Sequence, residues 1–212
     1  KGEESFDTLN RDEKVRDFFT KNFPDAAALM PDLAKEFLDH PTGSMVTVKG
    51  LPWHVEDKVL LLGDAAHAIV PFFGQGMNCA FEDCHHVDRL IQRQMGLGRT
   101  TERIDWKEVF AEFEKARKKD TDAIADLAVE NFIEMRDLVA QPKFQLKKKV
   151  ERILEDTYPG LFVPKYTMVT FRRIPYSLSR LRGEIQEKIL DELCANISTP
   201  EELDLKRADV LI

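Results

Sequence analysis

The sequence is poor in cysteine, has no long apolar run and carries no excess of positive charge. Its three cysteines, Cys79, Cys84 and Cys194, make no disulfide framework, and their spacing matches no usual zinc site. No stretch reaches the roughly 20 apolar residues that a membrane span needs, and no signal peptide is recognisable. The net charge of −7 argues against nucleic acid as a partner, because phosphate binding needs concentrated Lys and Arg.

The composition is that of an ordinary soluble globular protein. With 43% hydrophobic and 33% charged residues, the 212-residue chain can bury a sizeable core. The basic runs at 115–119 and 147–149 are flanked by acidic residues, so we interpret them as solvated helix faces. Cys79 and Cys84 lie among helix-forming residues and are expected to be buried thiols. His85 and His86 have no third ligand at metal spacing, so no metal site is predicted.

Apolar periodicity and turn residues predict an α+β chain that is mostly helical. Helices are expected at 11–22, 31–40, 74–96, 106–139, 144–156, 177–196 and 200–210. A strand is expected at 44–49, and the apolar run 58–62 predicts a second strand that is buried on both faces. The segment 161–176 is rich in β-favouring residues and is expected to be extended.

The helix expected after Gly74 has one apolar and one polar face. The apolar stripe, which is expected to be buried, consists of Met77, Ala80, Phe81, Cys84, Val87, Leu90 and Ile91. The polar face carries Glu82, Asp83, His85, Asp88 and Arg89.

The junction between the second strand and this helix is a candidate ligand site. Asp64 follows the strand, and at the carboxyl edge of a sheet its carboxylate can accept hydrogen bonds from sugar or ribitol hydroxyls. Gly74 and Gly76 allow close approach to a helix N-terminus whose free N–H groups favour negative charge. Phe72 and Phe73 could cover a planar ligand. The alternative is that the glycines only form a tight turn and that Asp64 only caps a helix.

A longer pattern around these residues resembles a known family. Gly63-Asp64-Ala65-Ala66-His67, Pro71, Gly74-Gln75-Gly76-Met77-Asn78 and Asp83 follow in the order of the second flavin motif of class A FAD-dependent aromatic hydroxylases. The resemblance implies the C-terminal part of a Rossmann-like FAD-binding fold followed by a helical domain. It also implies FAD-binding residues, namely Asp64 at the ribitol, with Pro71, Gly74, Gly76, Met77 and Asn78 along the flavin. His67 in this motif more often has a structural hydrogen bond than a general-base role.

Three segments are similar to the kynurenine 3-monooxygenase family in particular. They are Pro71 to Asn78, Asn131 to Arg136 and Tyr166 to Phe171. The resemblance implies substrate contacts from Asn131, Tyr166, Phe72, Phe73, Glu134 and Met135. Asn131 and Glu134 also share an apolar helical stripe, so the alternative is a buried network that ties helix to loop. Tyr166 and one of the two phenylalanines could equally be plain core residues.

The resemblance implies hydroxylation of L-kynurenine to 3-hydroxykynurenine with FAD, NADPH and O2. Expected divisions are 1–50 as the end of a substrate-binding domain, 51–98 in the FAD-binding domain, and 99–212 as a helical domain. Because the chain begins at Lys1 and lacks GxGxxG, we interpret it as a fragment whose partner is an N-terminal FAD-binding half. A homodimer is possible. A cytoplasmic protein is expected, or a truncated form of a mitochondrial outer-membrane protein. The rivals are a related hydroxylase with another substrate and a non-catalytic flavin-binding fragment.

Overall fold

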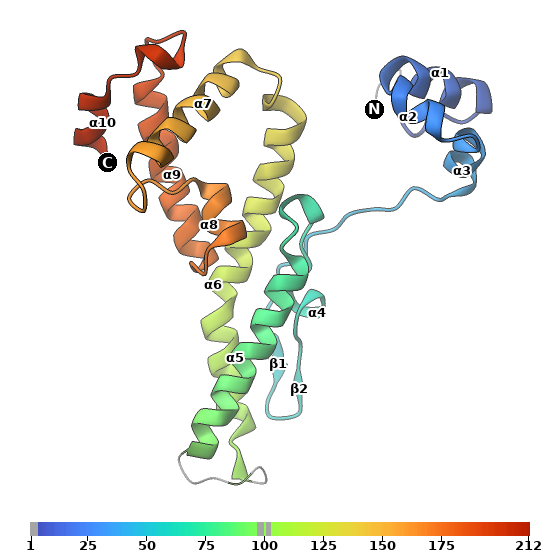
Figure 1. Cartoon of the computed structure of the whole chain (residues 1–212). Coiled ribbons are helices and arrows are strands. Elements are labelled where there is room, and N and C mark those ends of the chain that lie inside the picture. The colour runs from blue at the N-terminus through green and yellow to red at the C-terminus, as the bar shows by residue number, and fades with distance from the viewer. Residues whose placement is uncertain (1–3, 97–99, 101–102) are drawn as a thin grey trace. The chain divides into compact units, whose positions relative to one another are not determined.

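Helices dominate the structure, a computed structural model that describes residues 4–96, 100 and 103–212 (Figure 1). The chain divides into two compact units, one ending at Met45 and the other running from Val46 to Ile212. The predicted mostly helical character is therefore confirmed. Within the described ranges, no helix combines the length and apolar character that crossing a membrane requires.

The first unit is a small cluster of three helices, α1 (Asp12–Asn22), α2 (Pro24–Leu29) and α3 (Leu33–Asp39). Its core consists of Leu9, Val15, Leu33 and Ala34. The helices expected at 11–22 and 31–40 are confirmed. The short helix α2 was not predicted, because Pro24 was interpreted only as the end of α1. Proline is equally suited to the first turn of a new helix, where its missing N–H costs nothing.

The predicted strand at 44–49 is wrong. These residues have no regular structure, and Met45 and Val46 are exposed. The one backbone hydrogen bond from this segment runs from Val48 N–H to the carbonyl of Ala68, at 2.8 Å. Alternation predicts a strand only where a neighbouring backbone completes the ladder, and none does so here within the described residues.

The second unit begins with a short antiparallel hairpin, β1 (His54–Val55) paired with β2 (Val59–Leu60). The turn carries Glu56 at a positive φ of 50°. The strand predicted at 58–62 is therefore present but short. The prediction that it is buried on both faces is wrong, since Val59 and Leu61 are exposed. Among the described residues, β1 is the only strand that pairs with it.

After the hairpin, two short elements lead into a long helical pair. These elements are α4 (Asp64–His67) and the 3-10 turn η1 (Pro71–Phe73), and the pair is α5 (Gly76–Gly96) and α6 (Trp106–Ile133). The two long helices run antiparallel and pack against each other (Figure 1). The helix expected from Gly74 begins two residues later, and the one expected from Trp106 begins there.

The buried face of α5 differs from the prediction. Met77 and Phe81 are 70% and 65% exposed, and Cys84 is exposed as well. The fully buried residues of the helix are Cys79, Asp83 and Gln94.

Val87 and Leu90 of the predicted apolar stripe are partly buried and pack against the core cluster that includes Phe113 of α6. Of the face expected to be polar, Asp83 alone is buried, and Glu82, His85, Asp88 and Arg89 are exposed as predicted. Asp83 can be buried because Arg117 on α6 supplies a partner for its charge, as described below.

The remaining helices surround the far half of α6. They are the π-helical turn η3 (Glu134–Leu138), α7 (Pro142–Thr157), α8 (Lys165–Phe171), α9 (Tyr176–Leu193), the 3-10 turn η4 (Pro200–Glu202) and α10 (Leu205–Leu211). The helices predicted around 144–156 and 177–196 are confirmed. The extended segment predicted at 161–176 is wrong, because it contains α8, whose Met168 and Val169 are buried. Burial of these side chains overrides their β-preference.

Candidate functional site

The candidate site is the segment between β2 and α5, and Gly63 fixes its entry. Gly63 is buried and has φ 55° and ψ −139°, a conformation that L side chains rarely adopt. Its N–H donates to Oδ2 of Asp83 at 2.9 Å. The chain then turns into α4, which begins at Asp64. The alternative that Asp64 caps a helix is not what the structure shows, because Gly63 holds the cap position and Asp64 is the first helical residue.

Asp83 is the anchor beneath this segment. Its side chain is fully buried and also contacts Nε2 of His67 at 2.5 Å and Nε of Arg117 at 2.8 Å. Burial alone would raise the pKa of this carboxyl, but the hydrogen bonds from His67, Arg117 and Gly63 outweigh it and lower the pKa. His67 thus makes the structural hydrogen bond that its motif predicts. The cluster Gly63, His67, Asp83 and Arg117 is called the Asp83 anchor below.

Arg117 corrects the interpretation of the basic run 115–119 as solvated. Its side chain is only 2% exposed, and it contacts Asp83 and Glu82, the latter at 3.0 Å. It also donates to the carbonyl of Cys79 at 3.2 Å. A buried guanidinium needs such partners for its charge and its donors. The neighbouring Lys115 and Lys119 are exposed, as predicted.

The N-terminus of α5 faces an open hollow. The N–H of Cys79 bonds to the carbonyl of Gln75 at 2.8 Å, whereas those of Gly76, Met77 and Asn78 have no acceptor in the part of the chain that the structure describes. A hollow of about 390 Å³ adjoins this end of the helix and is lined by Asp64, Ile69, Pro71, Gly74, Gly76, Met77 and Ala80. Asp64 is exposed there. The structure thus brings together five of the six predicted flavin-binding residues, and Asn78 follows directly.

The two glycines of positive φ in this segment, Gly63 and Gly74, should respond differently to substitution. Gly63→Ala would force a strained φ and place a Cβ 3.1 Å from that of Ala80, whereas Gly74→Ala meets nothing within 4 Å. We expect Gly63→Ala to destabilise by about 1–3 kcal/mol beyond Gly74→Ala, since only Gly63 adds a steric clash to the strain. Urea unfolding of both variants measures this difference. Equal midpoints for the two variants would contradict the packing described here.

The predicted substrate residues form two contacts across the loop. Nδ2 of Asn131 donates to the carbonyl of Phe72 at 2.6 Å, which ties α6 to η1. The ring of Tyr166 stacks on that of Phe73, with centroids 5.6 Å apart. Phe73 is 5% exposed and lies in the core, while Tyr166 and Met135 remain about half exposed. The sixth residue, Glu134, instead pairs with Lys148 on α7 at 3.5 Å.

Sequence reasoning missed a second network under the loop. Gln75 is 5% exposed, and its Oε1 accepts from Nδ2 of Asn78 at 2.9 Å and from the Tyr176 hydroxyl at 3.5 Å. This network links the loop to α9, from residues about a hundred positions apart. No local pattern signals such a contact. Asp83 and Arg117 were missed for the same reason, although the family motif already includes the aspartate.

The cysteines of the chain differ in their exposure. Cys79 and Cys194 are buried, as the sequence predicts for Cys79, but Cys84 is exposed, which corrects the prediction for that residue. Burial raises the pKa of the Cys79 thiol to about 12 and also raises the pKa of the Cys194 thiol.

Because the thiolate is the reactive form, we expect only Cys84 of these three cysteines to react rapidly with Ellman's reagent in the folded protein. Cys84→Ser should abolish the fast phase, and a fast phase that persists would contradict this assignment.

The segment that contains the loop matches a known protein family. Residues 50–117, which include the Asp83 anchor and the hollow, match the family described as FAD binding domain. Three curated proteins named kynurenine 3-monooxygenase match the whole length of the chain. That of Myxococcus xanthus is 50% identical over 211 residues (100% of this chain, 44% of the relative). Those of Flavobacterium psychrophilum and Dictyostelium discoideum are 46% and 42% identical, over 99% and 98% of this chain and 46% of each relative.

The chain spans less than half the length of the curated relatives that it matches. The identity nevertheless extends along the whole chain, in relatives from bacteria and from an amoeba. The chain belongs to the kynurenine 3-monooxygenase family and corresponds to a portion of that family's sequence.

Proposed function

We propose that the protein containing this chain is an FAD-dependent monooxygenase that hydroxylates L-kynurenine to 3-hydroxykynurenine with NADPH and O2. The observation that carries the proposal is the hollow between Asp64 and the N-terminus of α5, with the Asn131 bridge to η1 beside it. The names of the curated relatives support the choice of kynurenine as substrate.

The residues around the hollow fit FAD. Asp64 offers an exposed carboxylate to ribitol hydroxyls, and Gly74 leaves open space in front of its backbone. The free N–H groups of Gly76, Met77 and Asn78, together with the helix dipole, favour negative charge on the isoalloxazine. When bound, FAD supplies the transfer of electrons from NADPH and the activation of O2. This chain contributes binding, orientation and the apolar surroundings.

The proposed substrate residues Asn131 and Tyr166 both contact η1, whose Pro71 lines the hollow. Oδ1 of Asn131 has no donor among the described residues, and the Tyr166 hydroxyl lies on a half-exposed side chain. Both groups can bind the amino-acid end or the anilino ketone of L-kynurenine. Met135 and Phe72 both contact the Asn131 amide nitrogen, and their side chains supply apolar surface there. By fixing the carbonyl of Phe72, the Asn131 bridge would hold the loop at one distance from the substrate.

Exposed apolar side chains support the proposal that the rest of an FAD-binding domain packs on this chain. Met77 and Phe81 on α5 are exposed, and so are Val59 on β2 and Leu61 directly after that strand. Several large apolar side chains that are exposed to solvent are typical of a surface that another part of the protein covers. We therefore assign 51–98 to a Rossmann-like FAD-binding domain that an N-terminal half completes. Residues 1–50 and 99–212 are then the end of a substrate-binding domain and a helical domain.

The proposal is tested by substrate-dependent NADPH oxidation in the FAD-loaded protein that contains this chain. We expect L-kynurenine to stimulate oxidation, and 4-hydroxybenzoate at the same concentration to leave the background rate unchanged. Stimulation by the hydroxybenzoate alone would assign the protein to a related hydroxylase. Stimulation by neither, with FAD bound, would favour a non-catalytic flavoprotein.

A further inference from the structure

Tyr176, the first residue of α9, reaches the flavin loop from the far side of α6 in the sequence. Its side chain is 5% exposed and belongs to one buried cluster with Phe73 of η1 and Cys79 of α5. The helix α9 packs along α6 (Figure 1), and the N–H of Ser177 donates to Oδ1 of Asp120 on α6 at 2.9 Å. Both the ring and the backbone therefore fix the position of Tyr176.

The hydroxyl of Tyr176 meets the side chain of Gln75, the residue between the two glycines of the loop. Oε1 of Gln75 accepts from this hydroxyl at 3.5 Å, which is long for a hydrogen bond, and from Nδ2 of Asn78 at 2.9 Å. An amide oxygen has two lone pairs, so these two donors satisfy it. Because the side chain of Gln75 is only 5% exposed, bulk water does not readily replace a donor that is lost.

Two acceptors compete for the single proton of the hydroxyl. Burial, and after it the charge of Glu82, raises the pKa of Tyr176, so the hydroxyl keeps its proton at neutral pH. Glu82 is exposed to solvent and already pairs with Arg117 at 3.0 Å. Its carboxylate thus has other partners. Among the described residues, the buried oxygen of Gln75 has only Asn78 besides this hydroxyl.

Gln75 transmits the constraint to the N-terminus of α5. Its carbonyl accepts from the N–H of Cys79 at 2.8 Å, and its side chain holds Asn78 in the first turn of the helix. The free N–H groups of residues 76–78 belong to the same turn. A rotation of Gln75 would therefore change the direction of the donors that face the hollow.

A second tyrosine holds the neighbouring part of the loop. The ring of Tyr166 on α8 stacks on that of Phe73, and α8 ends at Phe171, shortly before α9 begins. Tyr166 and Tyr176 thus contact Phe73 and Gln75, two residues apart in the loop, from consecutive helices. Loss of the Tyr176 hydroxyl would release one of these two attachments.

We propose that Tyr176 is a positioning residue of the FAD site, a role that rests on the proposed function in taking FAD as the ligand of the hollow. Its hydroxyl fixes the carboxamide of Gln75 and thereby the direction in which the N-terminus of α5 faces the flavin. Because Tyr176 is buried beneath the loop residues that it contacts, it acts through Gln75 and touches neither FAD nor the substrate.

Tyr176→Phe tests this role, because the substitution removes the hydroxyl and keeps the ring in its buried cluster. In the protein that contains this chain, we expect the dissociation constant for FAD to rise about tenfold, a loss of about 1.4 kcal/mol, and the visible absorption of the bound flavin to shift. Hydrogen exchange at the N–H of Cys79, measured without FAD, should also become about tenfold faster. An unchanged FAD affinity or an unchanged exchange rate would overturn the role.

Tyr158→Phe is the matched control. It removes a hydroxyl that donates to Oδ1 of Asp209 at 2.6 Å, between the end of α7 and α10 rather than at the loop. The FAD affinity, the flavin spectrum and the exchange at Cys79 should all stay at their wild-type values. A control that weakens FAD binding as much as Tyr176→Phe would show a general loss of packing and would contradict the role of Tyr176.

A double variant identifies the acceptor through which the hydroxyl acts. Gln75→Met removes the amide and keeps a side chain of similar length, so it should also weaken FAD binding about tenfold. Adding Tyr176→Phe to Gln75→Met should then weaken binding by less than about twofold more, because the hydroxyl has already lost its partner. A further loss as large as that of Tyr176→Phe alone would mean that the hydroxyl acts through Glu82, and would contradict the proposal. None of these measurements uses L-kynurenine, so a different substrate would leave their outcome unchanged.

Discussion

Replacing Asp83 with Asn is expected to destabilise the folded chain by about 3–5 kcal/mol and to release FAD. The substitution removes the charge that balances the buried Arg117 and alters the acceptors for His67 and Gly63. With the anchor gone, Gly63 loses the bond that fixes the entry of the loop. Urea unfolding measures the first effect, and bound FAD after gel filtration measures the second.

Asp88→Asn is the matched control, since Asp88 is exposed on the same helix. It should change stability by less than about 0.5 kcal/mol and retain FAD. Equal behaviour of the two variants would contradict the role given to Asp83.

The Asp83 anchor also predicts that the stability of the chain falls in acid. Because the folded pKa of Asp83 is lowered, its contribution is complete above the unfolded value near 3.9 and is lost as pH falls towards the folded pKa. Asp83→Asn should therefore lose part of the wild-type decline in stability below about pH 4.

Asn131→Ala is expected to raise the KM for L-kynurenine by roughly tenfold to a hundredfold while FAD stays bound. The substitution removes the hydrogen bond to the carbonyl of Phe72 and an amide that faces the proposed substrate. Loss of one buried hydrogen-bond partner costs about 1–3 kcal/mol, which corresponds to this range of affinity. Steady-state kinetics with a parallel measurement of bound FAD separates the two effects.

Asn196→Ala makes the same chemical change at an exposed position after α9 and should leave both quantities unchanged. Loss of FAD from Asn131→Ala, with the KM of the remaining holoenzyme unaltered, would make Asn131 a purely structural tie between α6 and η1. That outcome corresponds to the buried-network alternative that the sequence leaves open.

Local sequence patterns predicted most helices because a helix is specified by periodicity and by its first and last residues. Pro142 and the Tyr158-Pro159-Gly160 turn bound α7, and Asp105 caps α6 by accepting from the N–H of Glu108 at 3.0 Å. The segment from Gly63 to Asn78 was likewise recognisable, since its residues act through backbone geometry within a few positions of one another.

The burial of Asp83 and the exposure of Met77 and Phe81 could not be predicted from the pattern of α5 alone. An amphipathic stripe shows that two faces differ, but not which partner each face meets. Here the partner of Asp83 is Arg117, on a helix 34 positions away in the sequence. The apolar residues Met77 and Phe81 stay exposed within this chain. The error at 161–176 is similar, because the tertiary contacts of Met168 and Val169 select a helix.

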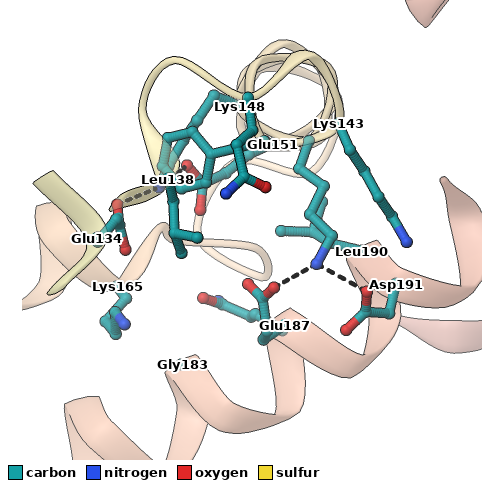
Figure 2. A pocket seen from close by; sticks show the side chains of 14 residues that line it. Glu134, Leu138, Lys143, Lys148, Glu151, Lys165, Gly183, Glu187, Leu190 and Asp191 are labelled. Atoms are coloured by element: carbon teal, nitrogen blue, oxygen red, sulfur yellow. Dashed lines mark hydrogen bonds and ion pairs between the residues drawn. The ribbon is translucent and has the colours of Figure 1, made fainter. Parts of the chain in front are cut away.

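The π-helical turn η3 was also beyond sequence reasoning. It begins at Glu134, three residues after Asn131, and also carries Met135, so the helix changes its winding among the proposed substrate residues. Such turns are frequent at functional sites. Lys148 on α7 pairs with Glu134 of this turn (Figure 2).

The most direct test of the proposed function is product analysis after turnover of L-kynurenine with NADPH under ¹⁸O₂. The account predicts 3-hydroxykynurenine that carries one ¹⁸O atom in its new hydroxyl group, formed by the FAD-loaded protein that contains this chain. NADPH oxidation with no hydroxylated product, or a product whose hydroxyl oxygen comes from water, would contradict it.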